Sequence, residues 1–230
     1  MIFDYEHQMV RTAENWLYSQ VSEVKREFST PWGICDLVGC SLNKNKVKKR
    51  LKFRQVKSIG PQLRVMILSI IPDFEDGKTI TSQKLQNKFK DYFASYRIIH
   101  EINQLIKDRF VVETDTGKYQ KLNGWAPLHK KLIALELKLT RVNDAFNQAI
   151  NNLGFADESY VGLPMEIATR LIKSKKKAEF THKGIGILGI NPNSYKVLLK
   201  SKPLETNPNP IMQMHSVERF WLTYPKDTLT

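Results

Sequence analysis

The stretch from Leu132 to Leu139 constrains the fold most, because it is an apolar run that contains two charged residues. It reads Leu-Ile-Ala-Leu-Glu-Leu-Lys-Leu and has the length of a buried strand. Side chains alternate across a strand, so Glu136 and Lys138 should emerge on one face and the neighbouring leucines on the other. Charges in an apolar strand are unfavourable unless they are paired or functional. An exposed ion pair near a sheet edge is the simpler interpretation, so a functional one needs a second carboxylate.

Two other acidic residues stand where apolar residues would be simpler. Residues 8–28 carry apolar side chains at spacings of three and four, which predicts a helix, and Glu14 falls inside its apolar stripe. Asp36 lies in the middle of a strand predicted over Ile34–Cys40, where aspartate is disfavoured. The structural alternatives are a glutamate that reaches water from the margin of the stripe and an aspartate that forms a turn at a strand end.

The charge of the chain indicates a polyanionic partner. A net charge of +13 and a pI near 9.6 are typical of nucleic-acid binding, although a membrane surface would also fit. No apolar run approaches the length of a membrane span, so we expect no membrane association. Residues 44–57 interleave basic and apolar side chains, which predicts a basic strand or ribbon. Its expected phosphate contacts are Lys48, Lys49 and Arg50, and a solvated charged loop is the alternative.

Residues 58–124 have the pattern of a separate module. Pro61 can start a first helix, and Thr81 or Ser82 can cap a second. A third helix follows, and then Thr114–Gly117 supplies a hairpin signal between two short strands. The order resembles a winged helix-turn-helix, whose third helix enters the major groove while its hairpin touches the DNA backbone. The resemblance implies contacts to bases or phosphates from Ser95, Tyr96, Arg97, His100 and Lys118. Winged helices also serve as protein-contact or purely structural modules.

After the Glu136 strand, the pattern predicts a helix from Arg141 to Asn152 and a strand from Ser159 to Leu163. The helix has one clear stripe, and Gln148 lies within it, polar where an apolar residue would be simplest. Gly184–Gly189 matches GxGxxG by letter, but lysines precede it and Asn-Pro-Asn follows. We therefore interpret that segment as a strand with small residues.

These pieces together resemble the PD-(D/E)XK nuclease superfamily. The matching residues, in chain order, are Glu14, Asp36, Glu136-Leu137-Lys138 and Gln148. The resemblance covers roughly residues 8–41 and 130–200. It departs from the family in the cysteine that precedes Asp36, where proline is usual, and in the long interval between Asp36 and Glu136. Insertion of the basic ribbon and the winged helix would explain that interval.

The resemblance implies an α/β fold: a restriction-endonuclease-like mixed sheet flanked by helices, with an inserted winged-helix domain. We expect the first part of the nuclease core over residues 1–57, the insertion over 58–124 and the second part of the core over 125–230. The implied function is that of a divalent-metal-dependent DNA endonuclease. The alternative is a non-catalytic DNA-binding protein or regulator that has a nuclease-like fold.

The chemistry of phosphodiester hydrolysis agrees with these residues. Mg²⁺ prefers oxygen ligands and takes one or two carboxylates, which Asp36 and Glu136 could supply, with the carbonyl of Leu137 as a third oxygen. Mn²⁺ should substitute for it. Lys138 would orient or help to deprotonate the attacking water. By family resemblance, Glu14 would assist metal binding and Gln148 would position the lysine or a DNA phosphate.

The cysteines and the N-terminus bear on location and assembly. Cys35 and Cys40 fall in one predicted strand with opposite parity, so we expect no disulfide between them. Residues 1–6 lack the layout of a signal peptide, and we expect a cytoplasmic protein. Its expected partner is double-stranded DNA, and a homodimer is compatible with the sequence.

Overall fold

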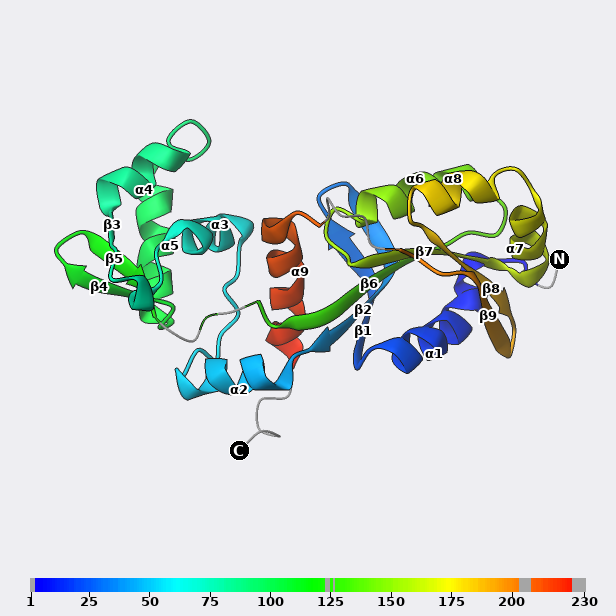
Figure 1. The fold of residues 1–230 in the computed structure, drawn as a ribbon, viewed down its shortest axis with the longest axis horizontal. Coiled ribbons are helices and arrows are strands. Elements are labelled where there is room, and N and C mark those ends of the chain that lie inside the picture. The colour runs from blue at the N-terminus through cyan, green and yellow to red at the C-terminus, as the bar shows by residue number, and fades with distance from the viewer. Residues whose placement is uncertain (1–2, 123–124, 126, 203–207, 225–230) are drawn as a thin grey trace. The chain divides into compact units, whose positions relative to one another are not determined.

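The computed structural model describes residues 3–122, 125, 127–202 and 208–224 (Figure 1). The chain divides into two compact units. Unit 1 comprises Met1–Leu42 and His129–Gln213, and unit 2 comprises Asn43–Leu128 and Met214–Thr230. Unit 2 is therefore larger than the predicted insertion, because it also takes in residues 43–57 and the C-terminal part of the chain.

Unit 1 is built on a mixed six-stranded sheet, so the predicted α/β class with a mixed sheet flanked by helices is confirmed. Along the sheet, the first strand pairs antiparallel with the second, and the second pairs antiparallel with the third. The third, fourth and fifth strands are parallel to one another, and the sixth is antiparallel to the fifth. In sheet order the strands are β1 (Glu23–Thr30), β2 (Gly33–Leu42), β6 (His129–Leu137), β7 (Glu158–Pro164), β8 (Gly186–Asn191) and β9 (Ser194–Leu199).

Helices cover both faces of this sheet, as Figure 1 shows for the blue α1 and the yellow-green α6. On one face, η1 (Glu6–Met9) and α1 (Val10–Gln20) pack on Leu135 and Leu137 of β6. On the other face, small residues of α6 (Val142–Asn152) and α7 (Met165–Lys173) pack with α8 (Lys177–His182) against β7 and β8. Leu135 and Leu137 thus face α1, which leaves the intervening Glu136 on the α6 side, as the alternation predicts.

The predicted helix over residues 8–28 is wrong in its second half. The helix ends at Gln20, and Glu23–Thr30 is strand β1, which pairs with β2 through a two-residue turn at Pro31-Trp32. Val21 and Val24 continue the helical spacing of apolar residues, but Phe28 also fits an alternating strand pattern. Pairing with β2 decided between the two, because propensity and spacing are weak compared with tertiary contacts.

Within residues 58–122, unit 2 contains the expected three α-helices and hairpin in the predicted order. Pro61 is the N-cap of the first helix, and the side chain of Thr81 caps the second by accepting from the backbone N–H of Lys84 at 3.2 Å. The elements in chain order are α2 (Lys44–Lys52), α3 (Gln62–Ile70), η2 (Phe74–Asp76), β3 (Ile80–Thr81), α4 (Ser82–Phe89), α5 (Ser95–Lys107), β4 (Val111–Asp115) and β5 (Lys118–Lys121), followed after unit 1 by residues 214–223 of α9 (Pro210–Thr223). The three strands form a small sheet in the order β3-β5-β4.

The basic ribbon predicted for residues 44–57 is wrong, because Lys44–Lys52 is helix α2. Asn43 caps this helix by accepting from two backbone N–H groups, and Val47 and Leu51 have helical spacing on its inner side. Arg50 is fully buried and donates to Glu218 at 2.5 and 2.9 Å. Its guanidinium group is thereby used inside the unit, so the structure contradicts the predicted phosphate contact from Arg50.

Candidate active site

Asp36 and Glu136 lie opposite each other where β2 and β6 separate. Leu37 pairs with Leu135, and the two carboxylates occupy the next position along each strand. The backbone N–H of Leu137 donates to Asp36 Oδ2 at 2.7 Å, so this side chain caps β6 at the end of the ladder. Lys138 Nζ lies 3.8 Å from the same oxygen. The structure therefore brings together the two carboxylates and the amine that are about a hundred residues apart in the sequence.

Glu136 is buried, with 2% of its surface exposed. Its Oε1 accepts a hydrogen bond from Asn152 Nδ2 at 2.6 Å, whereas no described residue donates to its buried Oε2. Burial raises the pKa of Glu136 to about 7. The nearby Asp36 adds to this rise, and the Asn152 hydrogen bond and the Lys138 charge oppose it.

Lys138 is held by three oxygen atoms. Besides Asp36, its Nζ donates to the carbonyl of Leu137 at 3.0 Å and lies 3.5 Å from Glu6 Oε2. The other Glu6 oxygen accepts from the backbone N–H of Leu139 at 3.3 Å. Burial raises the pKa of Asp36, while the Leu137 N–H and Lys138 lower it.

Glu6 contacts the site through Lys138, whereas Glu14, which the resemblance places there, does not. Glu14 instead forms a two-pronged ion pair with Arg26 of β1, and no described hydrogen bond or ion pair joins it to Asp36, Glu136 or Lys138. Glu6 precedes the apolar stripe on which the helix prediction rests. No periodicity signal could have found it, because it lies in η1, outside the predicted helix.

Asn152 was the second residue that sequence reasoning missed, although it belongs to the same stripe of α6 as the predicted Gln148. It bonds Glu136, and its Oδ1 accepts from Trp32 Nε1 at 3.2 Å. Gln148, one turn earlier, keeps a buried Oε1 that accepts no hydrogen bond from any described residue. The sequence did contain a signal for Asn152, because it is a polar residue within the stripe of the predicted helix, and the structure shows that this position is buried.

Both cysteines are free and buried, as the prediction of no disulfide requires. Cys35 lies beside the site, where its Sγ accepts from Asn152 Nδ2 at 3.4 Å and donates to the carbonyl of Leu37 at 3.4 Å. Burial, together with the Glu136 carboxyl group, raises the pKa of Cys35 well above its ordinary value. The thiol is therefore a neutral part of the wall of the site and is a poor nucleophile.

The donor set at the site fits a hard divalent cation. In the described part of the chain, no group of three or more His, Cys, Asp or Glu side chains is placed to hold a metal ion. Mg²⁺ typically takes only one or two carboxylates, and its other ligands are water and substrate oxygens. Here Glu136 Oε2 is a buried oxygen that accepts a hydrogen bond from none of the described residues, and the Asp36 carboxyl group lies near Glu136. Both observations favour a cation at this position.

The residues predicted to contact nucleic acid are exposed, except for Arg50. At the start of α5, the Tyr96 side chain projects into solvent, and Arg97 lies over the ring of Phe93 at 5.5 Å. On β5, Lys118 pairs with Asp115 at 3.2 Å. The full set of exposed candidates in unit 2 is Lys48, Lys49, Ser95, Tyr96, Arg97, His100 and Lys118.

Comparisons of the chain with protein-family models, with curated proteins and with solved structures found no match. In the described part of the chain, no helix combines the length and apolarity needed to cross a membrane. We therefore infer the function from the geometry of the site.

Proposed function

We propose that this protein is a divalent-metal-dependent DNA endonuclease that hydrolyses phosphodiester bonds. The convergence of Asp36, Glu136 and Lys138 at the separating ends of β2 and β6 is the observation that carries the proposal. The order α1, β2, β6, α6, β7 supports it, because a helix, two strands, a helix and a strand were expected in that order from the resemblance. A restriction-endonuclease-like core and an inserted winged helix are part of this proposal.

Asp36, Glu136 and the carbonyl oxygen of Leu137 would hold the cation. When bound, it would polarise the phosphate and lower the pKa of the attacking water. Lys138 would orient that water and offset the negative charge that develops on the phosphate oxygens. Glu6 positions Lys138, and Asn152 fixes the orientation of the Glu136 carboxylate.

Unit 2 supports DNA engagement through two exposed surfaces. The start of α5 presents Tyr96 and Arg97 to solvent, as the third helix of a winged helix would. The outer side of α2 presents a basic stripe, whose exposed members are Lys44, Lys48, Lys49 and Lys52. Phosphate contacts from such residues make binding strongly dependent on salt, and they carry little sequence information.

The rival function is a DNA-binding protein without catalysis. Burying a carboxylate whose second oxygen lacks a donor destabilises a fold, and an apolar residue would remove that penalty. A protein that only held DNA would gain nothing from this arrangement, whereas a metal-dependent hydrolase requires it. Glu136 therefore favours the enzyme over the binding protein.

Cleavage of supercoiled plasmid in Mg²⁺ or Mn²⁺ tests the proposal. The wild-type chain should produce nicked or linear DNA, and Asp36→Asn or Lys138→Met should slow cleavage by roughly a hundredfold or more. Both variants should retain DNA binding in a gel-shift assay. Glu14→Gln is the matched control, because its carboxylate pairs with Arg26, and it should cleave at the wild-type rate.

Two outcomes would count against the enzyme. Unchanged cleavage by Asp36→Asn or Lys138→Met would remove these residues from the mechanism. Binding without cleavage by the wild-type chain, in both metals and on linear, supercoiled, single-stranded and branched DNA, would favour the non-catalytic alternative.

A further inference from the structure

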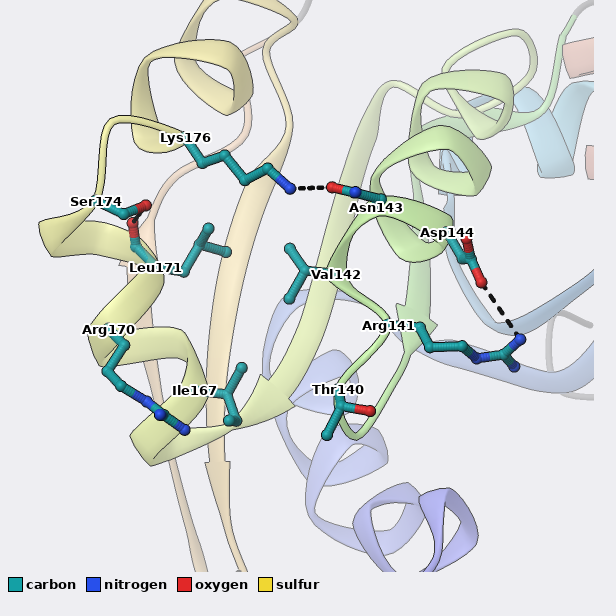
Figure 2. A pocket seen from close by; sticks show the side chains of 10 residues that line it. All are labelled: Thr140, Arg141, Val142, Asn143, Asp144, Ile167, Arg170, Leu171, Ser174 and Lys176. Atoms are coloured by element: carbon teal, nitrogen blue, oxygen red, sulfur yellow. Dashed lines mark hydrogen bonds and ion pairs between the residues drawn. The ribbon is translucent and has the colours of Figure 1, made fainter.

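A groove of about 660 Å³ opens between the start of α6 and the second half of α7 (Figure 2). Both helices follow parallel strands of the sheet, α6 after β6 and α7 after β7. In open α/β sheets, ligands commonly bind outside the carboxyl ends of such strands. The volume is in the range of sites that hold small ligands, so it suits a short stretch of one strand of a larger partner.

The groove has an apolar floor and a basic rim. Val142, Ile167 and Leu171 lie between the two helices in Figure 2. Arg141, Arg170 and Lys176 supply three positive charges at the rim, and Asp144 is the one acidic residue that lines the groove, which leaves a net charge of +2 among the lining residues. An apolar floor beneath separated cations suits a sugar or base whose flanking groups are phosphates.

The cations at the rim are held loosely. Arg141 pairs with Asp144 at 3.3 Å and Arg170 with Glu166 at 3.5 Å, and more than half of each of these side chains is exposed. Lys176 donates to the side chain of Asn143 across the groove. Exposed ion pairs contribute little to the stability of a fold, so a phosphate can replace these partners with little loss of stability.

The groove begins next to the candidate active site. Thr140 lines it and follows Lys138 by two residues, so their Cα atoms are within about 7 Å. The N-cap of α6 is Arg141, and within the described residues no side chain caps this helix end. The backbone N–H of Val142 donates to the carbonyl of Thr140, and the next N–H groups of α6 add to the attraction for an anion that the basic rim creates.

We propose that this groove holds the DNA strand that flanks the cleaved bond, with Arg170 at one of its phosphates and Lys176 at another. The inference rests on the proposed function, because it assigns the substrate contact beside the same site. The occupant is a polynucleotide strand, because its phosphates match the basic rim and its sugars or bases match the apolar floor.

Replacing single phosphates of the DNA with uncharged methylphosphonate linkages tests the contact one phosphate at a time. A series of oligonucleotide duplexes, each with a single methylphosphonate near the cleavage position, is cleaved by the full-length protein under single-turnover conditions. For the wild-type chain, neutralising a phosphate that contacts the groove should slow cleavage roughly tenfold, as expected for loss of one charge-assisted hydrogen bond. Arg170→Gln and Lys176→Gln should each slow cleavage of unmodified DNA by a similar factor, and each should become insensitive to one such linkage, a different one for each residue.

Lys175→Gln is the matched control, because this exposed lysine lies in the same segment but does not line the groove. It should cleave normally and keep the sensitivity to the neutral linkage. Multiplicative effects of residue and linkage at every position, or equal losses in Lys175→Gln, would overturn the proposal.

A separate readout distinguishes failure of the groove from failure of the nuclease. If the wild-type chain binds the duplexes without cleaving them, the dissociation constant is measured for each duplex of the same series. Coupling of Arg170 or Lys176 to one linkage would then support the groove while the hydrolytic function failed. Absence of coupling in the dissociation constants would overturn the groove as well.

Discussion

Replacing Glu136 with glutamine should stabilise the metal-free protein at alkaline pH. The pKa of this carboxyl group rises from an ordinary value of 4.5 to about 7 on folding, because it is buried and lies near Asp36. At about 1.36 kcal/mol per pH unit, ionised Glu136 disfavours the folded state by roughly 3 kcal/mol above pH 7. Glutamine resembles the protonated carboxyl group in shape and carries no charge, so it removes this penalty.

The difference in free energy of unfolding between Glu136→Gln and the wild type should depend on pH. A carboxyl group whose pKa is raised on folding contributes stability below its unfolded pKa, and that contribution is lost as the pH rises through its folded pKa. At pH 4 the wild-type side chain is mostly protonated in both states, so Glu136→Gln should match the wild type in its free energy of unfolding. At pH 8.5 the variant should be more stable by roughly 3 kcal/mol. Urea unfolding at both pH values, with a chelator present, measures the difference.

Glu218→Gln is an informative control, because Glu218 is equally buried but well paired. Its oxygens accept from Arg50 at 2.5 and 2.9 Å and from the backbone N–H of Ile59 at 2.9 Å. Neutralising it leaves the buried guanidinium group of Arg50 without a counter-charge, which should destabilise the protein by about 3 kcal/mol. If Glu136→Gln also lost stability at pH 8.5 without metal, the carboxylate would have a stabilising partner and the reasoning would be refuted.

Three further predictions concern cleavage activity and metal affinity. Glu6→Gln should lower the cleavage rate at saturating metal about tenfold by releasing Lys138, whereas Glu14→Gln should not, and the reverse order in a plasmid assay would restore the role first expected for Glu14. Trp32→Phe keeps the ring but loses the N–H that holds Asn152, so the apparent affinity for Mn²⁺ should fall roughly tenfold in a calorimetric titration, and an unchanged affinity would separate Asn152 from the site. Cleavage at low Mg²⁺ should increase with pH up to about 7, because the proton on Glu136 competes with the metal, and the profile should move to lower pH as Mg²⁺ increases.

The sequence was most informative where two independent patterns coincided. The apolar run around Glu136 and the apolar segment Ile34–Cys40 around Asp36 each predicted a strand, and the structure pairs those strands with the carboxylates opposite each other. Alternation alone placed Glu136 on the face opposite its leucine neighbours. The mixed sheet was expected from the resemblance, and the order of helices in unit 2 was predictable from periodicity and cap residues.

The remaining errors share a physical cause, which is that contacts distant in sequence decide between local alternatives. Val24 fitted a helix until pairing with β2 made its segment a strand, and residues 44–52 fitted a ribbon although Asn43 caps a helix there. Arg50 looked like a phosphate ligand, but Glu218 lies 168 residues away in the sequence and buries it. No pattern near Glu6 could show that it reaches Lys138, which is 132 residues away.

Crystals grown with Mn²⁺ and examined by anomalous diffraction at the manganese edge would show whether the site holds a metal ion. We expect an ion bound by the carboxylates of Asp36 and Glu136 and by the carbonyl oxygen of Leu137, and loss of that ion in Asp36→Asn. An ion held elsewhere in a preparation that cleaves DNA, with Asp36 and Glu136 free of it, would overturn the proposed metal site.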